Sequence, residues 1–240
     1  KRVNWSKIQQ MNSNGLFEQI RLKKSYLCIG LDSEFEKLPP SLQKNKNPQL
    51  DFNQAIIMAT HPFTIAYKIN TAFYEARGTA GWQAMEDTVR FIRSLNHNIF
   101  IIADAKRGDI GNSTEMYART FLDNLDFDAV TVSPYMGSDS VAPFLQRQGK
   151  WIILLAVTSN KGAEDFQLLK MKDSGECLFQ SVIDKSSRWG TPDNMTFVAG
   201  ATRPEMIRQM SDPRKDGVPG RMARRGNTRR RCSVHGKLSQ

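Results

Sequence analysis

The stretch that decides the fold is residues 99–114, Ile-Phe-Ile-Ile-Ala-Asp-Ala-Lys-Arg-Gly-Asp-Ile-Gly-Asn-Ser-Thr. Its apolar half, Ile99 to Ala103, predicts a buried strand. The charged half follows without a break and contains Asp104, Lys106, Arg107 and Asp109. Side chains two apart in an extended chain point to the same side, so Asp104 and Lys106 are expected to face one space. Parallel α/β enzymes present catalytic groups in this way, although solvated charges at an ordinary strand exit give the same pattern.

The same succession of an apolar run, polar residues and a helical period recurs along the chain. Strands are expected at residues 26–31, 63–67, 99–104, 127–132, 151–157 and 196–199. Helical spacing of apolar residues predicts helices over residues 16–22, 51–60, 81–95, 114–125, 141–145 and 178–189, and residues 33–50 are expected to form a polar, proline-containing loop. Strand-then-helix units with nearly uniform apolar strands predict a parallel sheet covered by helices.

Polar side chains stand at every expected strand exit: Asp32, Lys68, Asp104, Ser133, Ser159 and Thr202. An open doubly wound sheet binds its ligand mainly at one switch point, whereas a closed (β/α)8 barrel carries functional groups at many strand ends. The distribution therefore favours an α/β TIM barrel. The barrel is expected to be incomplete, because six βα units are recognisable and strands seven and eight are missing or corrupted.

The positive charge of the chain belongs to its tail. The chain of 240 residues has a net charge of +10, and residues 211–240 hold nine Lys or Arg and two Asp, which leaves +3 for the rest. The tail has no hydrophobic period, so a disordered basic segment that binds nucleic acid or another anion is one interpretation. Against nucleic acid, the tail has no aromatic residue on which bases could stack.

The three cysteines are widely spaced, at Cys28, Cys177 and Cys232. They form neither a disulfide framework nor a metal-ligand pattern, which favours a reducing, cytoplasmic setting. The sequence contains no apolar run long enough to span a bilayer and does not start with a signal-peptide pattern.

The motifs at the strand exits resemble those of the orotidine 5'-phosphate decarboxylase family, and more narrowly its longer bacterial branch. The carrying residues are Gly30-Leu31-Asp32, Ala66-Tyr67-Lys68 and the run Asp-Ala-Lys-Arg-Gly-Asp-Ile-Gly at 104–111. Further matches are Pro134-Tyr135-Met136-Gly137 and residues 155–160, and the resemblance runs from about Met11 to Met210. It implies a (β/α)8 barrel that acts as a homodimer, has no metal or organic cofactor, and converts orotidine 5'-phosphate to UMP and CO2.

The resemblance also implies roles for single residues. Lys106 corresponds to the proton donor to C6 of the pyrimidine, and Asp104 lies beside the departing carboxylate. Lys68 pairs with Asp104 and reaches the ribose, and Asp32 is similar to the acid that binds a ribose hydroxyl.

Other implied roles lie outside this group. Asp109 and Ile110 enter the neighbouring subunit's site, and Ser113, which stands where the family usually has Thr, reaches across the same interface. Ser159 resembles the residue that hydrogen-bonds the pyrimidine ring. Pro219 stands at the seventh-strand exit, where the family binds the phosphate.

The chemistry is intelligible from the residues. Loss of CO2 from a ring carbon without an electron sink leaves a localised carbanion, and no cofactor motif is visible to spread that charge. A preorganised ammonium can stabilise the anion and then deliver a proton. Alternating carboxylates keep lysines charged, so an array of Lys68, Asp104, Lys106 and Asp109 is expected.

Two alternatives and three smaller interpretations remain beside this hypothesis. A magnesium-dependent 3-keto-gulonate 6-phosphate decarboxylase shares the strand motif, but it has an acid at the position of Lys68, where a cation repels a metal. The nucleic-acid interpretation of the tail is the other alternative. Arg107 alternates away from Asp104 and is expected in a structural ion pair, Asn112 is expected to begin a helix, and the isolated histidines are assigned no function.

The chain departs from the family pattern at its end. After Val218-Pro219-Gly220 and Arg221, residues 222–226 read Met-Ala-Arg-Arg-Gly where the family has Gly-Ala-Gln-Gly-Gly, and another reading frame can encode the family residues. We therefore hypothesise a frameshift between about Met210 and Arg221. The chain is divided into an extension (1–10), a barrel domain (11–210) and a basic tail (211–240). Without two strands and the phosphate-binding segment, it is expected to fold poorly and to be weakly active or inactive.

Overall fold

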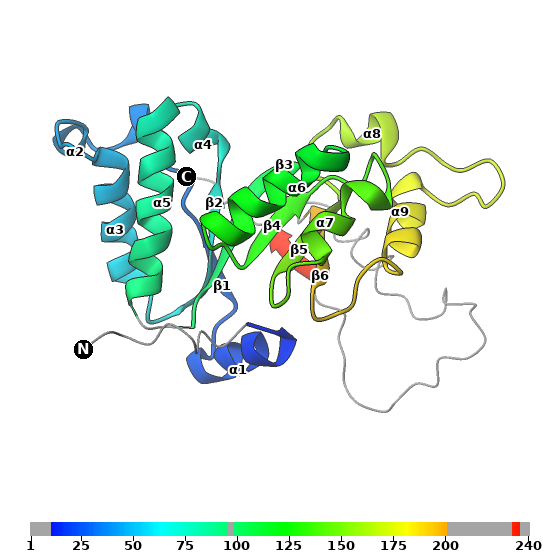
Figure 1. Ribbon diagram of the computed structural model, residues 1–240, viewed down its shortest axis with the longest axis horizontal. Helices are drawn as coiled ribbons and strands as arrows, with labels where there is room; N and C mark the ends of the chain where they lie inside the picture. The colour runs from blue at the N-terminus through cyan, green and yellow to red at the C-terminus, as the bar shows by residue number, and fades with distance from the viewer. Residues whose placement is uncertain (1–10, 96–97, 201–231, 236–240) are drawn as a thin grey trace.

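The computed structural model describes residues 11–95, 98–200 and 232–235 of the chain. Within these ranges the strands form one parallel sheet, in which each strand pairs with the next one along the chain. Figure 1 shows this curved sheet and the helices along it. The strands are β1 (Leu27–Gly30), β2 (Thr64–Asn70), β3 (Phe100–Arg107), β4 (Ala129–Val132), β5 (Trp151–Val157), β6 (Met195–Gly200) and β7 (Cys232–His235).

The helices follow the strands in alternation. They are α1 (Ser13–Lys23), α2 (Pro40–Gln43), α3 (Pro48–Thr60), α4 (Ala72–Glu75), α5 (Gly78–Ser94), α6 (Gly111–Ala118), α7 (Ala142–Leu145), α8 (Ala163–Phe166) and α9 (Leu178–Ser186). Short 3-10 turns lie at Phe35–Lys37 and Ser138–Ser140, and a π-helical segment, η3, spans Arg119–Asn124. None of the described helices combines the length and the apolar character that a membrane crossing requires.

Alternation along the strands separates two apolar layers. One face of the sheet contributes Tyr67, Ile101 and Val130 to the main core, which the helices on that face complete. The opposite face contributes residues such as Ala66 and Ile102 to an inner core on the concave side of the sheet. Side chains on the same side of the strands as Ala66 and Ile102 therefore face the space that a barrel encloses.

Helix α1 closes the amino end of this inner space. Met11 packs there among inner residues of β3 and β5, and the indole nitrogen of Trp151 donates a hydrogen bond of 2.7 Å to the carbonyl oxygen of Met11. The helix begins at Ser13, and the side chain of the preceding Asn12 accepts a hydrogen bond from the amide of Gly15 as an ordinary N-cap. The amino end of the strands is thus filled by packing, which leaves the carboxyl end for chemistry.

Over the described residues, the structure confirms the α/β class and an incomplete barrel. Six predicted strands and all six predicted helices are present, with ends displaced by a few residues. The predicted helix over 114–125 is divided between α6 and the π-helical segment η3. In the described sheet β1 has β2 as its one neighbour, so the sheet keeps an open edge there and Leu27 and Cys28 are exposed.

Two expectations were wrong in part. The loop expected over residues 33–50 contains a 3-10 turn, α2 and the start of α3, because Pro40 and Pro48 occupy first-turn positions where proline favours a helix. The tail was expected to hold no strand, yet β7 pairs in parallel with β6, with Phe197 opposite Cys232. Its sequence, Cys-Ser-Val-His, lacks the continuous apolar run that marks the six predicted strands, so the pattern did not indicate a strand.

A buried hydroxyl fixes the exit of β1. Tyr74 of α4 donates a hydrogen bond of 2.8 Å to the carbonyl oxygen of Leu31 and accepts one of 2.8 Å from the side-chain amide of Asn53 in α3. Its hydroxyl also lies 3.1 Å from Oγ of Ser33, and burial raises the pKa of Tyr74 to about 12. Leu31 and Ser33 flank Asp32, so this hydroxyl positions the backbone that carries Asp32.

Replacing Tyr74 with Phe is expected to lower the free energy of unfolding by about 1–3 kcal/mol, because Leu31 and Asn53 lose a buried partner. Urea unfolding at pH 7 measures the loss. The contribution of the neutral hydroxyl is present below the ordinary tyrosine pKa of about 10 and is lost as the pH rises through about 12. Tyr26→Phe, on an exposed side chain, is the matched control. Equal stability of the two variants would contradict the assignment.

Candidate active site

Four charged side chains meet at the carboxyl ends of β1, β2 and β3. The ammonium nitrogen of Lys68 lies 3.0 Å from Oδ1 of Asp32 and 3.3 Å from Oδ2 of Asp104. The ammonium nitrogen of Lys106 lies 2.7 Å from Oδ1 of Asp104. We call Asp32, Lys68, Asp104 and Lys106 the charged tetrad. The prediction that Asp104 and Lys106 face one space is confirmed, and Lys68 lies beside them.

Strand register explains why these residues meet. Lys68 is opposite Gly30 of β1 and Ile102 of β3, so it stands beside the exits of both neighbouring strands. Asp104 comes two residues after Ile102 and therefore points to the same, inner side of the sheet. The alternation that places Ala66 and Ile102 in the inner core continues into charged residues at the carboxyl end.

The tetrad is most buried at its centre. The side chains of Asp104 and Lys68 are 4% and 9% exposed, whereas those of Asp32 and Lys106 are 41% and 50% exposed. A buried charge is tolerated only when it is paired and hydrogen-bonded, and Asp104 meets an ammonium at each oxygen. The four charges sum to zero, yet the field along the row is strong because positive and negative groups alternate. The most accessible ammonium is that of Lys106.

Lys106 has an unusual backbone conformation. Its φ is +48°, in the left-handed region, where a residue other than glycine is strained by roughly 1–2 kcal/mol. The ladder between β3 and β4 shifts at this point: Ala103 lies opposite Val130, but the next pair is Arg107 with Val132. A bulge of this kind redirects a side chain at the end of a strand.

Thr131 of β4 lies opposite this bulge, and its role was not identified from the sequence. Its buried hydroxyl accepts a hydrogen bond of 2.8 Å from the backbone amide of Lys106 and donates one of 3.1 Å to Oδ1 of Asp104. One sequence feature could have indicated Thr131: it lies two residues after Ala129 and so faces the same side of the strand, and Ala129 belongs to the inner core. A polar residue that faces the inner side of an otherwise apolar strand is a candidate site residue.

The residues predicted to serve a neighbouring subunit lie apart from the tetrad of their own chain. Asp109 accepts a hydrogen bond of 2.8 Å from the amide of Ile110, and no ion pair within the described ranges joins Asp109 to Lys106. Ile110 is 56% exposed and Ser113, in the first turn of α6, is exposed. Their roles stay predictions.

The loop after β5 carries Ser159. Ser159 is exposed, and a side chain at Gly200 would come within 2.9 Å of its backbone nitrogen, so the ends of β5 and β6 pack together only because residue 200 is glycine. The preceding Thr158 is held by Gln167, whose side-chain oxygen accepts a hydrogen bond of 2.8 Å from its amide. The predicted phosphate-binding residue Pro219 lies outside the described residues.

Arg107 is structural, as expected from its alternation. It pairs with Glu75 of α4, and its guanidinium lies 5.2 Å from the ring centres of both Tyr117 and Phe121. It therefore joins β3 to α4 and to the helical segment that follows the tetrad. Asn112 lies in the first turn of α6, which agrees with its expected place at a helix start.

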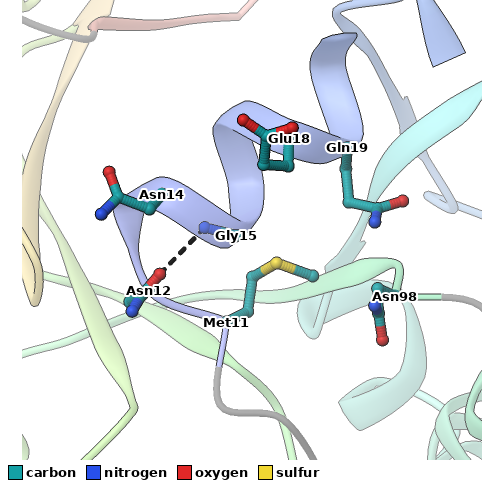
Figure 2. Close-up of a pocket in the computed structure, with 7 residues that line it drawn as sticks. All are labelled: Met11, Asn12, Asn14, Gly15, Glu18, Gln19 and Asn98. Carbon is teal, nitrogen blue, oxygen red and sulfur yellow. Dashed lines mark hydrogen bonds between the residues drawn. The ribbon is translucent and has the colours of Figure 1, made fainter. Parts of the chain in front are cut away.

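A pocket at the opposite end of the sheet is a poor candidate for the site. Figure 2 shows that it is lined by the start of α1 and by Asn98, just before β3. Its single acidic residue is Glu18, and the start of α1 already has its own cap in Asn12. In barrel folds the amino end of the strands serves stability, whereas catalytic groups stand at the carboxyl end.

A barrel-type parallel sheet with paired charges at its carboxyl edge defines an enzyme of the α/β-barrel class. Within the described ranges, no three His, Cys, Asp or Glu side chains come together in a group that could hold a metal ion. The chain belongs to the orotidine 5'-phosphate decarboxylase / HUMPS family, whose model matches residues 25–219.

Curated relatives and solved structures agree with this membership. The chain is 52% identical over 225 residues to orotidine 5'-phosphate decarboxylase of Phocaeicola vulgatus, with 92% of this chain and 82% of the relative covered. It is 51% identical to the enzyme of Bacteroides fragilis strain YCH46 over the same shares. The structure of Leishmania donovani OMP decarboxylase matches with a TM-score of 0.69 and 33% identity, over 81% of this chain and 74% of that one.

Substituting Asp104 with Asn is expected to lower the free energy of unfolding by about 3 kcal/mol, because two ammonium groups lose their shared buried counter-ion. Chemical denaturation measures the difference. Asp173→Asn, on an exposed turn, makes the same change of charge and is expected to leave stability within about 0.5 kcal/mol of the unaltered chain. The same midpoint for both variants would show that the tetrad does not support the fold.

Proposed function

We propose that this chain decarboxylates orotidine 5'-phosphate to UMP and CO2, a step of pyrimidine nucleotide synthesis. The observation that carries the proposal is the ammonium of Lys106, which is held 2.7 Å from the buried carboxylate of Asp104 beside a second lysine. The names of the relatives, at about half of all positions identical, support the same substrate.

The tetrad fits the demands of this reaction. The bond between C6 and the carboxylate breaks, its electron pair stays on C6, and CO2 leaves. An ammonium already in place stabilises that pair without reorganisation of solvent, then transfers a proton from Nζ to C6. Lys106 regains its proton from water, to which its half-exposed side chain has access.

The other members of the tetrad hold Lys106 and the ribose. Asp104 holds the ammonium of Lys106 in place through their contact of 2.7 Å. Lys68 is buried between Asp104 and Asp32 and is the group that orders both carboxylates. Asp32 keeps an accessible side chain, which suits an acceptor for a ribose hydroxyl. Ser159, on the loop after β5, is proposed to hydrogen-bond the pyrimidine.

The proposed active form is a homodimer with shared sites. Asp109, Ile110 and Ser113 lie on the segment after β3 and are proposed to enter the partner's site. Exposed apolar side chains support an interface here: Ile110 is joined by Tyr135 and Met136 on the loop after β4. The loop after β4 lies close to the segment after β3: a Cβ atom added at Gly108 would lie 3.6 Å from the Met136 methyl carbon.

The alternatives have less support. The buried lysine beside Asp32 and Asp104 is a poor neighbour for magnesium, which weighs against the 3-keto-gulonate 6-phosphate interpretation. The nucleic-acid hypothesis, the frameshift and the expected weak activity all depend on residues 211–240, of which the structure describes only β7, so they stay predictions. We place the chain in the cytoplasm, where the free thiols of Cys28 and Cys177 persist.

Loss of orotidine 5'-phosphate absorbance tests the activity directly. The chain is expected to turn over the substrate above the uncatalysed background, and Lys106→Ala is expected to lower kcat by at least about 10³-fold, because one group both stabilises the carbanion and supplies the proton. Lys172→Ala, on an exposed turn, is expected to change nothing. A Lys106→Ala enzyme that keeps its turnover would remove the proposed proton donor.

Co-expression of two inactive variants tests the shared site. If Asp109 serves the partner, dimers that combine a Lys106→Ala chain with an Asp109→Ala chain have one intact site of two, and random pairing restores about a quarter of the unaltered activity. Lys106→Ala with Lys68→Ala is the control, since both residues belong to one chain's tetrad and no pairing restores a site. Recovery in neither mixture would argue that Asp109 acts within its own chain.

A further inference from the structure

The backbone at the end of β3 departs from regular pairing at the residue that carries the proposed proton donor. Between the pairs Ala103–Val130 and Arg107–Val132, three residues of β3 face the single residue Thr131. Lys106 therefore has no register partner in β4 within the described ladder, and its amide donates to the hydroxyl of Thr131, at 2.8 Å. The left-handed φ of Lys106, +48°, lies within this bulge.

The same hydroxyl is connected to the counter-ion of Lys106. Thr131 donates to Oδ1 of Asp104 at 3.1 Å, and this oxygen also accepts from the Lys106 ammonium at 2.7 Å. The contacts close a ring: Lys106 amide, Thr131 hydroxyl, Asp104 carboxylate, Lys106 ammonium. Thr131 is buried, so water does not readily replace its hydroxyl.

We propose that Thr131 is a positioning residue for the decarboxylation, holding the backbone of Lys106 and the carboxylate of Asp104 in one fixed relation. The inference rests on the proposed function, and it adds a residue that acts through Lys106 and Asp104. This one hydroxyl fixes the backbone from which the Lys106 side chain extends, and it also fixes the Asp104 carboxylate that the Lys106 ammonium contacts. The strained conformation of Lys106 persists because this contact holds its amide in place.

The residue type suits this task. A strand position favours a β-branched side chain whose χ1 is restricted, and threonine combines that restriction with a hydroxyl that both donates and accepts. Valine has the same shape without the hydroxyl, and serine has the hydroxyl without the methyl group. The two substitutions therefore separate the hydrogen bonds from the packing.

Steady-state kinetics with orotidine 5'-phosphate test the proposal. Thr131→Val is expected to lower kcat by about 10- to 100-fold with KM changed less than about 3-fold, because misplacing a reacting group acts mainly on the chemical step. Thr131→Ser is expected to keep kcat within about 3-fold of the unaltered chain. If Ser impairs kcat as much as Val does, packing rather than hydrogen bonding is responsible and the proposal is overturned.

Thr64→Val is the matched control for a buried strand threonine. Thr64 stands at the amino end of β2, away from the tetrad, and its buried hydroxyl donates to the carbonyl oxygen of Thr60 at 3.0 Å. Thr64→Val is expected to lower the melting temperature as Thr131→Val does, but to leave kcat unchanged. An equal fall of kcat in both variants would reduce Thr131 to a structural role. If Thr131→Val does not fold, Thr131→Ala is measured with the same expectations.

Amide hydrogen exchange supplies a readout that does not depend on activity. In the unaltered chain the Lys106 amide is expected to be protected, and Thr131→Val is expected to speed its exchange by at least about 10-fold, while Thr131→Ser and Thr64→Val leave it unchanged. Unchanged exchange in Thr131→Val would overturn the proposal. If the unaltered chain fails to decarboxylate but the exchange results hold, the proposed function fails while the positioning of Lys106 by Thr131 stands.

Discussion

The buried carboxylate of Asp104 is the constraint on which the rest of the site depends. A carboxylate with 4% exposure is stable only with partners at both oxygens, and it has Lys68 on one side and Lys106 on the other. Lys68, 9% exposed, in turn needs both Asp104 and Asp32, because a buried ammonium would otherwise lose hydration without compensation. The buried charges of the tetrad therefore depend on one another, because neither Asp104 nor Lys68 could be buried without its partners.

The architecture serves this arrangement from several directions. Strand register places Lys68 between the exits of β1 and β3, and Tyr74 fixes the backbone on both sides of Asp32. At the amino end, α1 fills the inner space through Met11 and its contact with Trp151. Packing thus occupies one end of the strands and charge the other. Asp32, just after β1, is 41% exposed and lies nearer to solvent than the centre of the tetrad.

An array of paired charges suits a reaction that generates a localised anion. Folding already orients these groups, so little rearrangement accompanies the chemical step. The gradient of burial matters as well, since Asp104 and Lys68 are rigidly enclosed while Lys106 reaches an accessible space. Rigid support for an exposed reactive group is what a positioned proton donor requires.

The sequence by itself determined six of the strands and six of the helices in their order, the shared space of Asp104 and Lys106, and the likeness carried by residues 104–111. These are local properties: side-chain alternation and apolar periodicity operate within a few residues. Arg107 could be assigned to a structural ion pair by the same alternation.

Only the tertiary structure decided the role of Thr131, the left-handed backbone of Lys106, the network around Tyr74 and the pairing of β7 with β6. Each depends on contacts between segments far apart in the chain. The Lys106 amide donates to the Thr131 hydroxyl because a bulge leaves Lys106 without a register partner in β4. The sequence of neither strand predicts that bulge. Local sequence sets which side of a strand a residue faces; the register of neighbouring strands sets what it meets there.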